Sequence, residues 1–176
     1  MKIIKIVVGY LYTNCYIIFD EKTKDAVVID PGADEYEILK SIKKEQLNVR
    51  AIINTHSHFD HTGANDSIKE RTGAELFAPE KDNETKSFVN LNFRFFLTPG
   101  HTKDGISLLI ENHLFSGDTL FADSIGRTDL GDGDPDELLS SIKKKLFLLP
   151  GNTFVHPGHG PDTTIEEEIE HNPFLK

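Results

Sequence analysis

The feature that most constrains this chain is the segment Thr55 to Gly63, which brings histidines and an aspartate together. It follows the apolar run Val49 to Ile53, which predicts a strand that ends where the segment begins. Alternate side chains of an extended segment point the same way, so His56 and His58 can bind one ion. Asp60 and His61, at the expected turn into a helix, can reach a second. The spacing therefore predicts a metal site.

Three further polar residues follow predicted strand ends, each beside a glycine. They are His101 after Phe93 to Leu97, Asp118 after Leu114 and Phe115, and His159 after Thr153 to Val155. Imidazole and carboxylate groups suit borderline divalent metals, zinc first, with iron or manganese possible where carboxylates bridge. With the first segment they make a candidate two-metal site.

The other histidines and the single cysteine are expected to serve the structure or face solvent. His113 lies in a predicted hairpin turn, His156 precedes the turn that bears His159, and His171 follows an acidic helix. Cys15 is expected to be a small core residue. One cysteine excludes an internal disulfide and fits a reducing cytosol, so a cytoplasmic location is expected.

The chain resembles the metallo-β-lactamase-fold hydrolases, and within them the hydroxyacylglutathione hydrolase (glyoxalase II) group. The resemblance is carried by Asn14-Cys15-Tyr16, Ile29-Asp30-Pro31-Gly32, the segment 55–63, Gly100-His101-Thr102, residues 115–121, Gly126-Arg127-Thr128-Asp129, Pro157-Gly158-His159-Gly160 and Asn172-Pro173-Phe174-Leu175. It implies an α+β fold, a four-layer αβ/βα sandwich of two sheets with helices outside both.

The resemblance also implies a distribution of ligands. It assigns His56, His58 and His101 to one metal and Asp60, His61 and His159 to the other. It makes Asp118 the bridge between the two metals. Two departures stand out: Lys103-Asp104-Gly105 replaces the family's Pro-Gly-Ser, and the chain stops at Lys176, where full-length glyoxalase II enzymes continue into a glutathione-binding helical domain. The resemblance is therefore to a short form, and it leaves specificity for glutathione open.

The expected function is hydrolysis of a thioester, S-lactoylglutathione or a similar acyl thioester. Two adjacent metals can share a water, lower its pKa and polarise the carbonyl that the bridging hydroxide attacks. Asp60 and Asp118 are the expected catalytic carboxylates. The alternatives are an iron-dependent persulfide dioxygenase and a lactonase, β-lactamase or other ester hydrolase of the same fold. A non-catalytic binding domain fits poorly with a complete ligand set.

Three residues near the expected site are candidates for supporting roles. Asp30 and Asp129 either orient a metal-binding imidazole or cap a turn. Arg127 either binds a substrate carboxylate or pairs with a neighbouring acid, and the pairing is favoured.

The length and charge of the chain limit the number of domains and the kinds of partner. With 176 residues the chain predicts a single domain, residues 1–176. A formal net charge of −10 disfavours nucleic acid, whose binders need a basic surface. No apolar run approaches the roughly 20 residues of a membrane span. A small-molecule substrate is the expected partner, and the sequence leaves the oligomeric state open.

Alternating strands and helices are expected along the chain. The best-defined helix is Asp134 to Leu148, with Asp134 as its cap, Pro135 at the first position and Glu137 completing a capping box. The acidic group Glu166 to Glu168 is expected on the exposed first turns of a surface helix.

Overall fold

The computed structural model describes residues 1–88 and 90–176 and divides them into two compact units. Unit 1 comprises Met1–Asn54, His58–Pro79 and Lys86–Asn92, and unit 2 comprises Thr55–Ser57, Glu80–Thr85 and Phe93–Lys176. The single domain of residues 1–176 stays a prediction.

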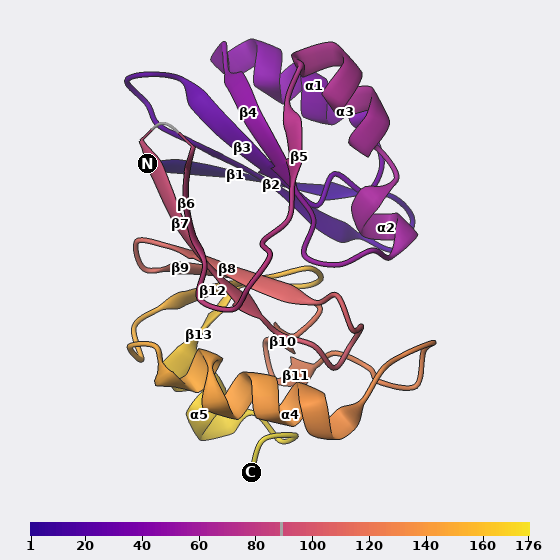
Figure 1. Ribbon diagram of the computed structural model, residues 1–176, viewed down its shortest axis with the longest axis vertical. Helices are drawn as coiled ribbons and strands as arrows, with labels where there is room; N and C mark the ends of the chain where they lie inside the picture. The colour runs from indigo at the N-terminus through magenta and orange to yellow at the C-terminus, as the bar shows by residue number, and fades with distance from the viewer. Residues whose placement is uncertain (89) are drawn as a thin grey trace. The chain divides into compact units, whose positions relative to one another are not determined.

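Unit 1 contains a five-stranded sheet in the order β1-β2-β3-β4-β5. Its strands are β1 Lys2–Val8, β2 Thr13–Phe19, β3 Asp25–Ile29, β4 Asn48–Ile53 and β5 Glu75–Phe77, and its helices are α1 Glu35–Glu45, α2 Phe59–Thr62 and α3 Asn65–Thr72. The first three strands pair antiparallel and β3, β4 and β5 pair parallel. Figure 1 shows α1 and α3 beside each other on one face of this sheet.

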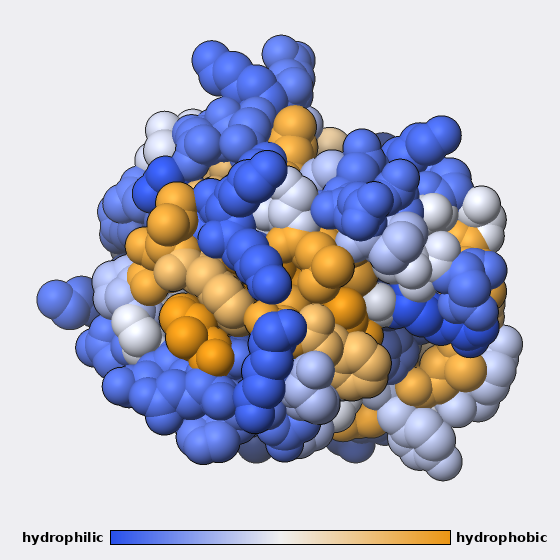
Figure 2. All heavy atoms as spheres, turned by 90° about the horizontal axis from the view of Figure 1, so that it is seen from below, coloured by the Kyte–Doolittle hydropathy of each residue, from blue (hydrophilic) through white to orange (hydrophobic). Residues whose placement is uncertain are grey.

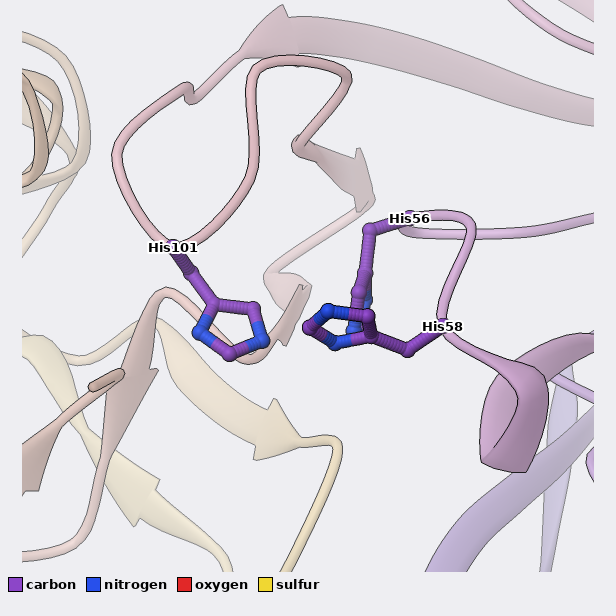
Figure 3. A group of neighbouring side chains, drawn as sticks. All are labelled: His56, His58 and His101. Carbon is purple, nitrogen blue, oxygen red and sulfur yellow. The ribbon is translucent and has the colours of Figure 1, made fainter. Parts of the chain in front are cut away.

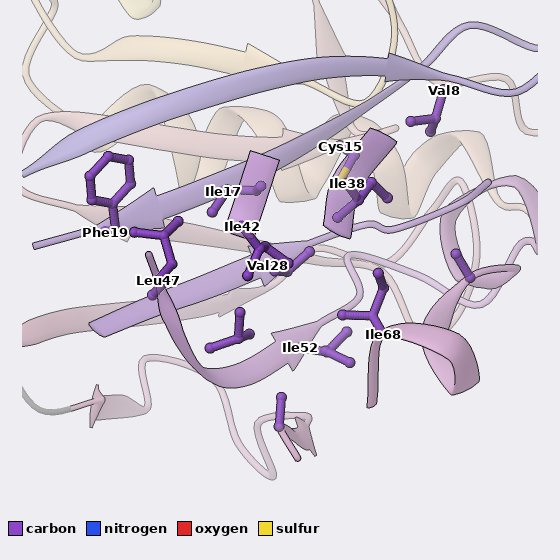
Figure 4. Close-up of a cluster of buried hydrophobic side chains, with 14 residues drawn as sticks. Val8, Cys15, Ile17, Phe19, Val28, Ile38, Ile42, Leu47, Ile52 and Ile68 are labelled. Carbon is purple, nitrogen blue, oxygen red and sulfur yellow. The ribbon is translucent and has the colours of Figure 1, made fainter. Parts of the chain in front are cut away.

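Continuous apolar strands explain why the middle of this sheet is buried on both faces. Every residue of β2 and β3 is buried, whereas the edge strand β1 mixes exposed and partly buried positions before the buried Val8. Helix α1 places Ile38 and Ile42 one turn apart on its buried face. Figure 4 shows these two side chains packed with Ile17, Val28 and other residues of the sheet. Truncating such an isoleucine to alanine costs about 2–5 kcal/mol.

Cys15 belongs to the same cluster, as predicted. It is fully buried, and burial raises the pKa of its thiol well above the ordinary value, with the charge of Asp30 adding to the effect. A thiol held in its neutral form is a poor nucleophile, so Cys15 serves packing.

The second sheet has six strands in the order β13-β12-β9-β8-β7-β6. Its strands are β6 Thr85–Phe88, β7 Leu91–Leu97, β8 Ile106–Ile110, β9 His113–Gly117, β12 Phe154–Pro157 and β13 Thr163–Thr164; β10 Leu120–Phe121 and β11 Ser124–Ile125 form a separate ribbon. The helical elements of unit 2 are α4 Pro135–Lys144, the 3-10 turn η1 Leu146–Leu148 and α5 Ile165–His171. A cluster including Leu114, Leu138, Ile142, Val155 and Ile165 joins α4 and α5 to the strands.

Helix α4 begins as predicted but ends earlier. The Asp134 side chain accepts hydrogen bonds from the backbone N–H groups of Asp136 and Glu137. The predicted capping box is wrong, because the Asp134 N–H donates to the Gly100 carbonyl at 2.8 Å and is not available to Glu137. The helix stops at Lys144, since Lys145 leaves helical geometry and its ammonium donates to the Leu97 carbonyl at 2.6 Å.

The expectation of an exposed acidic turn at the start of α5 is wrong for Glu168. This residue is fully buried. Its carboxylate accepts hydrogen bonds from the Asp123 N–H, the Thr163 hydroxyl and the Asn172 amide at 3.0, 2.6 and 2.7 Å. A local pattern of acidic residues does not show this burial, because it depends on the Asp123 backbone, which is distant in sequence, and on the side chains of Thr163 and Asn172.

Apolar side chains also reach the surface of unit 2. Leu148, Ile169 and Phe174 are exposed, and Figure 2 shows hydrophobic patches among hydrophilic ones on the face seen from below. Among the helices formed by the described residues, none combines the length and hydropathy that crossing a bilayer requires.

Candidate metal centre

Unit 2 brings together three of the predicted ligands from three strand ends. His101 follows β7, Asp118 follows β9 and His159 follows β12. The Nε2 atoms of His101 and His159 lie 3.6 and 3.5 Å from the same oxygen, Asp118 Oδ2. Such separations are long for hydrogen bonds. They match two donor atoms that share an ion, which at metal–ligand bonds of 2.0–2.2 Å in tetrahedral geometry lie about 3.3 Å apart.

His56 is held next to His101 in the same unit. The two rings meet edge to face with centroids 4.9 Å apart. Thr55 helps to position the His56 ring, since the Thr55 hydroxyl lies 3.1 Å from His56 Nδ1. The Thr55 carbonyl in turn accepts a hydrogen bond from the Ile106 N–H. Gly117 is required at this place, because a Cβ there would overlap the Thr55 side chain and the backbone φ is +52°.

A backbone carbonyl orients His101. His101 Nδ1–H donates to the Arg127 carbonyl at 2.7 Å, which leaves Nε2 directed toward Asp118. This hydrogen bond fixes the tautomer in which Nε2 offers a lone pair. The segment that provides the carbonyl packs tightly, since a Cβ on Gly126 would overlap the backbone of Asp118.

Unit 1 supplies the other ligands from one short segment. His58 caps the N-terminus of α2, and Asp60 and His61 lie in its single turn. His61 is fully buried, and its Nδ1–H donates to the carboxylate of Asp30 at 2.9 Å. Its other nitrogen lies 3.5 Å from Asp60 Oδ2, the same spacing as in unit 2. A carboxylate that holds the far nitrogen of an imidazole is a common partner of a metal-binding histidine.

Asp60 is positioned by two contacts within unit 1. The Thr13 hydroxyl donates to Asp60 Oδ2 at 2.9 Å. Gly32 lies against the Asp60 backbone so closely that a Cβ on it would overlap the carbonyl. The Asp30-Pro31-Gly32 sequence therefore provides both the partner of His61 and the close approach at Asp60.

Within unit 2, donor atoms of His56 and His101 lie within 4.8 Å of each other, as do donor atoms of His56 and Asp118. Within unit 1, the same holds for Asp60 and His61. Figure 3 shows the His56 and His101 rings, which come from the segment after β4 and the loop after β7. Imidazole nitrogens with a few carboxylates are a donor set suited to zinc or iron, so the residues fit a divalent metal.

Arg127 and Asp129 pair with each other in an exposed position. The guanidinium donates two hydrogen bonds to the carboxylate, at 2.8 and 2.9 Å. This pairing lowers the pKa of Asp129 to about 2, and the backbone N–H of Asp129 contributes. Asp129 thus binds the guanidinium of Arg127. Asp30, the other candidate for orienting an imidazole, accepts a hydrogen bond from the His61 ring.

Sequence reasoning missed several contacts around the site. Thr13 and the Arg127 carbonyl gave no signal, since neither belongs to a pattern of metal-binding residues. A hydrogen-bonded row formed by His113, His156 and Asp162 was also missed. Its signal was present in the spacing of His156 and Asp162 around His159.

Exposed aromatic side chains adjoin the ligand segment in unit 1. Tyr10, Tyr12 and Phe59 are 75%, 72% and 60% exposed, and the Tyr10 and Phe59 rings stack with centroids 6.1 Å apart. Phe59 stands directly between His58 and Asp60, and Tyr12 immediately precedes Thr13, which bonds Asp60.

Comparison with known proteins identifies the family of the chain. The Metallo-beta-lactamase superfamily pattern matches residues 8–87 and 82–159. Hydroxyacylglutathione hydrolase GloC of Haemophilus influenzae is 32% identical, with 92% of each chain covered.

Two solved structures are similar over almost the whole chain. BLEG-1 B3 metallo-beta-lactamase has 36% identity and a TM-score of 0.94, with 99% of each chain covered. ETHE1 from Myxococcus xanthus has 33% identity and a TM-score of 0.93, covering 98% of this chain and 84% of that one. The predicted α+β sandwich of the metallo-β-lactamase type is confirmed. The chain belongs to the metallo-β-lactamase superfamily of metal-dependent hydrolases.

Proposed function

We propose that this protein is a two-metal hydrolase of thioesters, with S-lactoylglutathione or a similar acyl thioester as substrate and zinc as the preferred metal. The observation that supports it most is the position of Asp118 Oδ2, at 3.6 and 3.5 Å from His101 Nε2 and His159 Nε2. One carboxylate oxygen between two imidazoles is the arrangement expected of a residue shared by two metals. The similarity to GloC supports the choice of a thioester.

The chain's own residues would hold the metals in a fixed geometry. His56, His58 and His101 would bind one ion, Asp60, His61 and His159 the other, and Asp118 both. Asp30 and the Arg127 carbonyl keep His61 and His101 in the tautomer that binds metal. Bound metals would activate a water and polarise the substrate carbonyl.

The exposed rings give the substrate a surface in unit 1. Tyr10, Tyr12 and Phe59 flank two proposed ligands and would contact an apolar part of the substrate. Arg127 is occupied by Asp129, so its side chain contributes little to binding a substrate carboxylate.

The test is a panel assay on metal-loaded protein. The substrates are S-lactoylglutathione, a thioester without glutathione, a lactone and a β-lactam, and oxygen uptake is measured with glutathione persulfide. We expect thioester hydrolysis to have the highest kcat/KM and to disappear after chelation. A higher kcat/KM for the β-lactam or the lactone, or persulfide-dependent oxygen uptake, would assign the protein to another activity of the superfamily.

A further inference from the structure

A side-chain hydrogen bond closes the base of the loop that bears His159. His156 Nδ1 lies 3.0 Å from Asp162 Oδ2. These two residues stand three positions before and three positions after His159. The bond therefore joins the two ends of the segment 157–161, and the Gly158 N–H donates to the Gly117 carbonyl at 2.8 Å within that segment.

A second hydrogen bond ties this closure to strand β9. His156 Nε2 lies 2.9 Å from His113 Nδ1. Strands β9 and β12 pair in parallel, and their regular register ends at His156, where a shift precedes Pro157. His113 begins β9, the strand that ends at Gly117 just before Asp118. The row of three side chains thus joins the strands that lead to two of the proposed ligands.

The hydrogen-bonding groups define where the protons lie. An ionised carboxylate only accepts, so His156 Nδ1–H donates to Asp162. In a neutral His156, Nε2 then accepts a hydrogen bond from His113 Nδ1–H. Each ring carries one proton in this arrangement. Burial, and next the neighbouring His156, lower the pKa of His113 below its ordinary value, which agrees with a neutral ring.

Packing holds the two rings in place. The His156 and Phe115 rings stack with centroids 4.9 Å apart, and the His113 and Phe154 rings stack with centroids 5.3 Å apart. His156 is 7% exposed. Ordered rings lose little conformational entropy on forming the bond, so the closure restricts the loop effectively. Gly160, with φ of +78°, gives the loop its reversal.

We propose that His156 and Asp162 are positioning residues that hold His159 in place for metal binding, with His113 as their link to β9. This inference rests on the proposed function, because it assigns His159 to the second metal. It predicts that the closure raises affinity for the second metal and leaves the first almost unchanged.

The experiment compares variants that keep the ring or the acceptor and change one bond at a time. His156→Phe retains a ring against Phe115 and removes both hydrogen bonds. Asp162→Ala removes only the acceptor, and Asp162→Asn restores an oxygen that can accept from His156. Zn²⁺ is titrated into metal-free protein with a competing chelator to resolve two equivalents. Circular dichroism and the Tm of the metal-free forms report on folding.

For His156→Phe and Asp162→Ala we expect the second Zn²⁺ to bind about 10-fold more weakly. This is the lower end of the loss in metal affinity that follows removal of a residue supporting a metal ligand. The first equivalent should change less than about 3-fold. Asp162→Asn should recover most of the loss. The double variant should lose no more than His156→Phe alone, because that variant already removes the bond to Asp162.

His171→Ala is the matched control. This histidine pairs with Glu167 on the exposed face of α5, so neither equivalent should change. Asp162 is exposed, which makes Asp162→Ala the decisive variant if His156→Phe does not fold.

If folded Asp162→Ala protein binds the second Zn²⁺ with unchanged affinity, the inference is overturned. An equal loss of affinity for the first and the second Zn²⁺ would also overturn it. A wild-type protein that takes up only one Zn²⁺ would also overturn it. A wild type that binds two and hydrolyses none of the thioesters would instead refute the proposed activity, and the affinity comparison would still decide the role of the closure.

Discussion

The proposed ligands of unit 1 and those of unit 2 are presented in opposite ways. In unit 1, His58, Asp60 and His61 come from one turn, so backbone geometry alone places them near one another. In unit 2, His101, Asp118 and His159 come from three strand ends that only the sheet brings together. A local set is fixed once its turn forms, whereas an assembled set depends on strand register and on the loops that follow each strand.

The two units also orient their imidazoles with different groups. His61 donates to a buried side chain, Asp30, whereas His101 donates to a backbone carbonyl. A carboxylate adds negative charge and can be replaced by mutation. A carbonyl is part of the chain, so replacing the side chain of Arg127 leaves it in place. Substituting Asp30 in unit 1 should therefore weaken metal binding more than substituting Arg127 in unit 2.

The largest expected effect is at Asp118, the residue on which the assembled set converges. Asp118→Asn removes the charge between His101 and His159 and should lower kcat/KM by at least about 10³-fold, or about 4 kcal/mol of transition-state stabilisation. Metal content should fall below that of the wild type while the circular dichroism spectrum is retained. Full metal content with wild-type turnover would show that Asp118 is not shared.

A matched pair of variants tests the difference in orienting groups. Asp30→Asn should weaken metal binding about 10- to 100-fold, the cost of losing a carboxylate behind a ligand. Arg127→Ala keeps the carbonyl at His101 and should stay within about 3-fold of the wild type. Chelator competition measures both. Equal losses in the two variants would show that the guanidinium, and with it the loop conformation, matters as much as the carbonyl.

The same contrast explains how much the sequence could predict. The local segment 55–63 has a spacing that indicates metal binding by itself. The strand ends beside glycine predicted His101, Asp118 and His159 as candidates, and the strands that precede them were found within a few residues. What the sequence could not predict depends on contacts that form only in the folded chain: the end of α4 at Lys144, the burial of Glu168 and the Arg127 carbonyl at His101.

Substituting the exposed aromatic residues of unit 1 should have a smaller effect, on KM. Phe59→Ser removes an aromatic surface between two proposed ligands, and Tyr12→Ser is its companion. Losing contact with a substrate's apolar group should raise KM about 10-fold for thioesters with long or aromatic acyl groups, since each buried CH₂ contributes about 0.8 kcal/mol. S-Lactoylglutathione should be affected less. Steady-state kinetics with a series of acyl chain lengths measure this, and a KM increase independent of acyl length would contradict acyl contact at these rings.

The smallest effect concerns the exposed pair of Arg127 and Asp129 in unit 2. The folded-state pKa of Asp129, about 2, lies below its ordinary value of 3.8. A lowered carboxyl pKa stabilises the fold above pH 3.8, and this contribution is lost as the pH falls through about 2. Solvent screens the pair, so thermal melts should hardly change, and the carboxyl carbon shift in NMR is the proper measurement. Arg127→Ala should move the titration toward 3.8, with Arg127→Lys in between because an ammonium cannot form the two-pronged contact. A midpoint that stays near 2 in Arg127→Ala would assign the shift to the backbone N–H of Asp129 instead.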